Sequence, residues 1–142
     1  MASPNDVAVG KLFRLEIDTP QKAALSADVE SFTAPGTEGS FQILHNHAPF
    51  LSTIDVGEVK VVDQFGNESV YATSGGFVEV SRNRVTFLAE TLEKKEEIDV
   101  KRANASKERA QSRLEKREPG TDFARAHAAL ARALNRLRVS GK

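Results

Sequence analysis

The chain has 142 residues, of which 39% are hydrophobic and 28% are charged, and it contains no cysteine. These values are typical of a globular protein, and they exclude wholesale disorder, disulfide frameworks and thiolate metal sites. The formal net charge is zero, yet residues 1–97 carry 8 Lys+Arg against 15 Asp+Glu, whereas residues 98–142 carry 12 against 5. This asymmetry indicates two units with different partners.

The first ten residues, MASPNDVAVG, contain no apolar run. We therefore expect residues 1–10 to be a flexible extension and not a signal peptide. No segment of the chain approaches the roughly 20 apolar residues that a membrane-spanning helix needs. We expect a soluble, intracellular protein without direct membrane insertion.

Residues 11–92 show a period of two, which is typical of β-strands. The segment FRLEID places Phe13, Leu15 and Ile17 on one face and charged side chains on the other. Further short runs rich in Val, Phe and Tyr are separated by DQFGNES and SRNR, whose compositions favour hairpin turns. The pattern predicts an antiparallel β-sandwich or flattened barrel of about ten strands.

Two short motifs in this region have a structural interpretation that we favour over a chemical one. HNH, residues 45–47, lacks a third metal ligand, so a role in a loop is favoured over a metal site. SGGF, residues 74–77, is followed by no Gly-Lys-Ser/Thr, so it predicts a bulge or tight corner and not a phosphate loop. No nucleophile, base and orienting group come together anywhere in the chain, so we expect it not to be an enzyme.

Residues 98–139 have a helical period and predict two helices in an antiparallel hairpin, giving an α+β fold overall. Asp99 is a natural N-cap for the first helix, REPGTD interrupts the pattern, and Thr121 or Asp122 caps the second helix. The predicted seam is mostly alanine, which buries little apolar area, so the two helices should be weakly held together. The seam positions are Val100, Ala103, Lys107, Ala110 and Leu114 in the first helix and Phe123, Ala126, Leu130, Ala133 and Leu137 in the second.

The arginines of both helices fall on one broad face of this hairpin at 100° per residue. With the turn centred near residues 119 and 120, they face one another as three pairs: Arg102 with Arg136, Arg109 with Arg132, and Arg113 with Arg125. Closing the hairpin should then be opposed unless an anion binds between the rows, and guanidinium groups suit phosphate. The pattern fits a solvated face equally well. Binding to nucleic acid is disfavoured because the basic face lacks aromatic residues and the sandwich is acidic.

The order and spacing of three segments resemble the epsilon subunit of rotary F-type ATP synthases. The segments are GTEGSFQILHNHAPFLSTI, YATSGGFVEVSRNRVTFLAE and IDVKRA, and the likeness covers nearly the whole chain after residue 10. The resemblance implies a β-sandwich docked on the gamma subunit and the membrane rotor c-ring, at the cytoplasmic face of the bacterial cell membrane. It also implies a hairpin that either folds against the sandwich or extends toward the catalytic alpha and beta subunits, impeding ATP hydrolysis.

In some bacterial members of that family, the Ile/Leu-Asp-x-x-Arg-Ala motif binds ATP as a regulatory ligand. The sequence of this chain requires no metal. Carried across by position, the implied ATP contacts are Glu93, Ile98, Asp99, Arg102, Ala103, Arg109, Arg132 and Arg136. Four of these are arginines that the helical geometry also selects. The hypothesis is that ATP phosphates hold the hairpin closed and that the hairpin opens when ATP is scarce. The alternatives are a purely structural coupling subunit without nucleotide binding and, more distantly, an unrelated phosphate- or RNA-binding adaptor.

Overall fold

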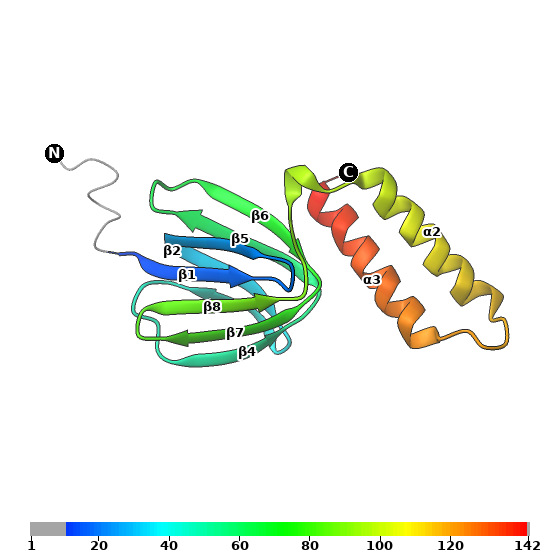
Figure 1. The fold of residues 1–142 in the computed structure, drawn as a ribbon, viewed down its shortest axis with the longest axis horizontal. Helices are drawn as coiled ribbons and strands as arrows, with labels where there is room; N and C mark the ends of the chain where they lie inside the picture. Colours follow the sequence, from blue (N-terminus) through cyan, green and yellow to red (C-terminus); the bar gives the residue numbers. More distant parts are fainter. Residues whose placement is uncertain (1–10, 142) are drawn as a thin grey trace.

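The computed structural model describes residues 11–141, so the predicted extension over residues 1–10 lies outside the described residues. A β-sandwich occupies one end of the molecule and a two-helix hairpin the other (Figure 1). Within residues 11–141 the strands are β1 Phe13–Asp18, β2 Ala23–Gly36, β3 Gly39–Ile43, β4 Phe50–Ile54, β5 Gly57–Asp63, β6 Glu68–Thr73, β7 Gly76–Ser81, β8 Arg84–Ala89 and β9 Leu92–Lys94. They are followed by the 3₁₀ helix η1 Lys95–Glu97 and the α-helices α2 Val100–Lys116 and α3 Phe123–Ser140. The predicted α+β fold is confirmed.

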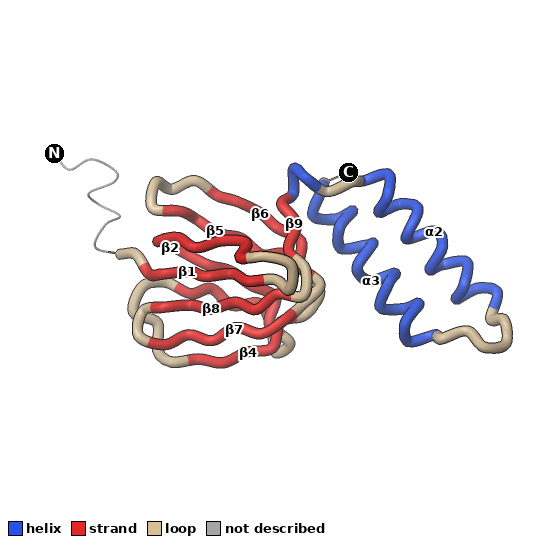
Figure 2. The backbone as a smooth tube through the Cα atoms, in the orientation of Figure 1, coloured by secondary structure: helices blue, strands red, loops and turns tan. Residues whose placement is uncertain are grey.

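The strands follow the order β1-β8-β7-β4-β2-β5-β6-β9, and β3 pairs with β2. The described residues form nine strands, close to the predicted ten, because β2 is one 14-residue strand that pairs with β1, β3, β4 and β5. The pairing of β1 with β2 closes the sheet on itself, giving the sandwich seen in Figure 2. One pairing among the described strands departs from the antiparallel prediction, since β1 and β8 run parallel. On their other sides, β1 pairs with β2 and β8 pairs with β7. The contact between β1 and β8 therefore arises from closure of the sheet and not from a hairpin.

The core lies between the two layers of the sandwich. Phe13, Leu15 and Ile17 are buried, as the period of two predicts. The rings of Phe32 and Phe87 meet with centroids 5.8 Å apart in a tilted arrangement. Aromatic pairs favour such geometry over a face-to-face stack. The remaining buried strand residues are mostly valine and isoleucine.

The glycine motif SGGF forms the predicted tight corner between β6 and β7. Gly76 has φ +151°, and a Cβ atom placed there would lie 2.1 Å from the carbonyl oxygen of Leu88. Neither the conformation nor the contact is open to another residue. The HNH segment lies in the β3–β4 loop, where the ring of His47 packs edge-on against Phe50. Among residues 11–141 no three potential ligand side chains gather into a metal site.

Two predicted hairpin turns close the far end of the sandwich, opposite the helices. In the β7–β8 turn, Arg82 and Asn83 both have positive φ, as a tight two-residue hairpin requires. In the β5–β6 turn, the Asp63 carboxylate accepts hydrogen bonds from the backbone N–H groups of Asn67 at 2.9 Å and Phe65 at 2.8 Å. The bond from Asn67 is the main reason why the pKa of Asp63 is lowered; burial opposes it by a smaller amount, and the Phe65 bond lowers the pKa further.

The two α-helices begin at the predicted caps. The carboxylate of Asp99 accepts from the backbone N–H of Arg102 at 3.0 Å, and that of Asp122 accepts from Arg125 at 3.0 Å. Each cap satisfies one of the free N–H groups of a first helical turn. The first helix ends at Lys116, and Gly120 in the loop has φ +85°.

The predicted alanine seam is largely confirmed, because Ala103, Ala110, Ala126 and Ala133 are all buried between the helices. Phe123 is an exception, since 42% of it is exposed. It lies in the first turn of α3, where its antiparallel counterpart is the polar last turn of α2 ending at Lys116. No helix among the described residues combines the length and the apolar character that crossing a bilayer requires.

Candidate site between the hairpin and the sandwich

The last turns of α3 dock on the end of the sandwich (Figure 1). Val139 packs there with Ala72 of β6 and with Ile98, and all three are buried. Beside them Asn135 is 3% exposed, and its amide nitrogen donates to the carbonyl oxygens of Gly57 at 2.9 Å and Thr73 at 3.3 Å. α3 therefore has a second buried stripe, on the side away from the alanine seam. Asn135 was not among the predicted site residues, although a polar residue of low helix propensity next to apolar positions was a usable signal.

A cleft of about 470 Å³ opens where the hairpin meets the sandwich. This volume lies within the range of small-molecule sites. Its walls come from the β1–β2 turn, from strand β9 with the residue before it, from η1, and from both helices. The lining residues are Thr19, Gln21, Lys22, Thr91, Leu92, Glu93, Glu97, Asp99, Arg102, Ala103, Ser106 and Arg136.

An ion pair lies at this cleft between Arg136 of α3 and Glu93 of β9. The guanidinium Nε donates to the carboxylate at 2.6 Å, and both side chains are about one-third exposed. This corrects the expectation that only a bound anion relieves the closed hairpin, because the sandwich supplies one carboxylate itself. Helical geometry could not find this contact, since Glu93 lies outside both helices.

Five of the eight residues implied by the resemblance line the cleft together: Glu93, Asp99, Arg102, Ala103 and Arg136. The other three lie around it. Ile98 is buried in the small apolar cluster with Val139, and Arg132 lines a narrow hollow beside Glu93 and Arg136. Arg109 donates to the hydroxyl of Ser106 at 3.1 Å, and Ser106 is itself a lining residue.

The predicted arginine pairs are brought together in two cases. Arg102 and Arg136 line the same cleft. Arg113 and Arg125 line a second hollow of about 450 Å³ at the hairpin loop. The pairing of Arg109 with Arg132 stays a prediction.

The cleft contains charges of both signs, in equal numbers: Lys22, Arg102 and Arg136 against Glu93, Glu97 and Asp99. Two of the acids already have partners, since Glu93 holds Arg136 and Asp99 caps α2. The guanidinium of Arg102 has no ion pair among the described residues. The arrangement suits a ligand that carries an anionic end together with polar groups that bond to carboxylates.

Comparison with known proteins matches two family models. The model for the ATP synthase delta/epsilon chain, beta-sandwich domain, matches residues 12–95, and the one for the long alpha-helix domain matches residues 96–141. The ATP synthase epsilon chain of Nitratidesulfovibrio vulgaris (strain DP4) is 47% identical over 131 residues, covering 92% of this chain and 97% of its own. That of Moorella thermoacetica is 44% identical over 127 residues, covering 89% and 95%.

Among solved structures, a chain in the mitochondrial ATP synthase of Euglena gracilis (OSCP/F1/c-ring) has a TM-score of 0.79 at 20% identity. The match covers 92% of this chain and 82% of that one, and at this identity it shows a shared fold. The sequence relatives and both family models agree over the sandwich and the hairpin. The chain therefore belongs to the delta/epsilon family of ATP synthase subunits, among the epsilon chains.

Proposed function

We propose that this chain is a non-catalytic part of the rotating central stalk of an F-type ATP synthase and that its hairpin binds ATP as a regulatory ligand. The stalk role is supported by solved structures of the same fold, described as the OSCP/F1/c-ring of Euglena gracilis and the central stalk/c-ring of Tetrahymena thermophila mitochondrial ATP synthases. The partners would be the gamma subunit, the rotor c-ring, and the alpha and beta subunits. The chain would then lie peripherally, at the cytoplasmic face of a bacterial membrane.

The observation that carries ATP binding is the cleft that Arg102 of α2 and Arg136 of α3 line together with Glu93 of β9. The guanidinium groups of the two helices offer a polyphosphate bidentate hydrogen bonds. The Asp99 cap fixes the first turn of α2, so Arg102 and Ala103 are presented at the cleft by a rigid element. The small side chain of Ala103 leaves room at the wall.

ATP bound there would touch the hairpin and the sandwich at once, so it would favour the docked hairpin. A ligand shifts such an equilibrium only by its differential affinity for the two states. Phosphate oxygens would also compete with the Glu93 carboxylate for Arg136. When ATP is scarce the hairpin would leave the sandwich and reach the catalytic subunits, where it would impede hydrolysis.

Calorimetric titration with ATP tests the site directly. The double variant Arg102→Ala, Arg136→Ala should bind ATP at least about 10-fold more weakly, because it loses charge-assisted hydrogen bonds of about 1.5–3 kcal/mol each. The matched control is Arg113→Ala, Arg125→Ala, which removes two arginines of the same helices at the other hollow. Equal affinities of the two double variants would refute the site.

A purely structural coupling role is the second candidate, and the Arg136–Glu93 ion pair favours it. With this contact, the docked hairpin has internal charge compensation at the cleft. In that case the unmodified chain would show no heat of ATP binding at physiological salt, and the cleft variants would affect only assembly of the complex.

A further inference from the structure

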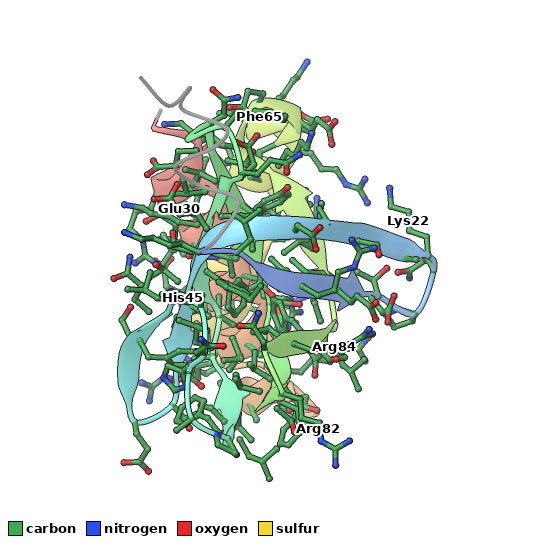
Figure 3. The ribbon with its side chains drawn as sticks, turned by 90° about the vertical axis from the view of Figure 1, so that its left-hand side faces the viewer. Lys22, Glu30, His45, Phe65, Arg82 and Arg84 are labelled. Atoms are coloured by element: carbon green, nitrogen blue, oxygen red, sulfur yellow. The ribbon has the colours of Figure 1, made fainter. Side chains whose placement is uncertain are left out.

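The β1–β2 turn, residues 19–22, forms a wall of the cleft that neither the helical geometry nor the family motif indicated. Thr19, Gln21 and Lys22 all line the cleft, although they precede the helices by about 80 residues in the sequence. Figure 3 shows Lys22 at the tip of the hairpin that β1 and β2 form. The sandwich thus contributes this turn to the site in addition to strand β9.

The turn is held in one conformation by hydrogen bonds between its two ends. The backbone N–H of Thr19 donates to the carbonyl of Lys22 at 2.9 Å, and the N–H of Lys22 donates back to the carbonyl of Thr19 at 3.3 Å. The Thr19 hydroxyl donates to the Lys22 carbonyl at 3.1 Å. Since β1 is itself paired on both sides, the Cα atom of Lys22 has a fixed place beside the cleft.

The ammonium group of Lys22 is exposed and makes no ion pair among the described residues. Of the three cations at the cleft, Arg136 is engaged by Glu93, so Lys22 and Arg102 are the two without a carboxylate partner in the described part of the chain. Arg102 belongs to the hairpin and Lys22 to the sandwich. An anion that contacts both would connect the two parts of the molecule.

We propose that Lys22 is a phosphate-binding residue of the ATP site and couples ATP binding to docking of the hairpin; this inference rests on the ATP site proposed above. A cation on the sandwich is in reach of the ligand together with Arg102 only when the hairpin is docked. Its interaction therefore contributes differential affinity for the docked state, which arginines confined to the hairpin do not supply alone.

The experiment is ATP titration by calorimetry on the full chain and on single variants. Lys22→Gln should weaken ATP binding about 3- to 10-fold, the range of a partly exposed charge-assisted contact. Lys22→Arg keeps a cation and should restore most of the affinity. Lys11→Gln is the matched control, because Lys11 is exposed and lies before the opposite end of β1.

The outcomes separate this inference from the proposal on which it rests. Suppose that the unmodified chain binds ATP and that the Arg102, Arg136 double variant binds it more weakly. If Lys22→Gln and Lys11→Gln then have the same affinity for ATP, the assignment of Lys22 is wrong and the ATP site stands. If the unmodified chain binds no ATP, both fail. In the absence of ATP, Lys22→Gln should leave the docked fraction of the hairpin unchanged, and a change there would assign Lys22 a structural role instead.

Discussion

Replacing Asn135 with alanine should release the helical hairpin from the sandwich. The amide group of Asn135 donates to two backbone carbonyls, those of Gly57 and Thr73, inside an interface where it is almost fully buried. Each net hydrogen bond contributes about 0.5–1.5 kcal/mol, and a carbonyl left buried without a partner costs about 1–3 kcal/mol. The docked state should therefore lose about 2–4 kcal/mol relative to the undocked state, which lowers the docking equilibrium roughly 30- to 1000-fold.

The Asn135→Ala substitution should not weaken α3 itself. Alanine has a higher helix propensity than asparagine, so α3 should stay helical while its attachment is lost. The matched control is Asn104→Ala, since Asn104 is exposed on α2. Both variants should give the same far-ultraviolet circular dichroism.

Docking is measured by energy transfer between two dyes. Because the chain contains no cysteine, single cysteines at Ala128 of α3 and Glu68 of β6, both exposed, provide specific attachment points. The Asn135→Ala variant should show a larger and broader separation between the dyes than the Asn104→Ala variant. If the two distributions coincide, the amide contacts do not determine docking, and the apolar contact of Val139 with Ala72 and Ile98 is sufficient.

Two further predictions concern the sandwich. Gly76→Ala should lower the free energy of unfolding, measured by chemical denaturation, by several kcal/mol, because the new Cβ would lie 2.1 Å from the Leu88 carbonyl oxygen. The control is Gly66→Ala, where φ is +84° and the space is open, and it should cost only about 1–2 kcal/mol. Equal losses would show that backbone strain alone matters. The lowered pKa of Asp63, held down first by the Asn67 N–H, means that its stabilising contribution is complete above the unfolded value of about 3.9 and disappears as pH falls through the folded pKa. In Asp63→Asn the free energy of unfolding should therefore depend less on pH in this acidic range, and an unchanged pH dependence would contradict the prediction.

Much of the fold was predictable because its signals are local. The burial of Phe13, Leu15 and Ile17 follows from alternation along one strand, and the start of α2 follows from one capping side chain, Asp99. The buried alanines follow from spacing within a single helix. Such signals depend on residues a few positions apart, so one sequence contains them in full.

The features that were missed join residues far apart in the chain. The parallel contact of β1 with β8 arises only when the sandwich closes. The bond of Glu93 to Arg136 depends on where α3 docks, as does the contact of Asn135 with Gly57. Helical-wheel geometry treats each helix alone, so it placed the arginines on a face but could not supply the partner that meets them.

The alanine seam also determines what happens after the two helices part. The fully buried seam residues that separation would uncover, Ala103, Ala110, Ala126 and Ala133, each carry a single methyl group, and the seam leucines Leu114, Leu130 and Leu137 are already partly exposed. Little apolar surface would then be exposed to water, so the separated helices should not associate nonspecifically with other proteins. Helices of this composition are suited to separating and pairing again many times without aggregation.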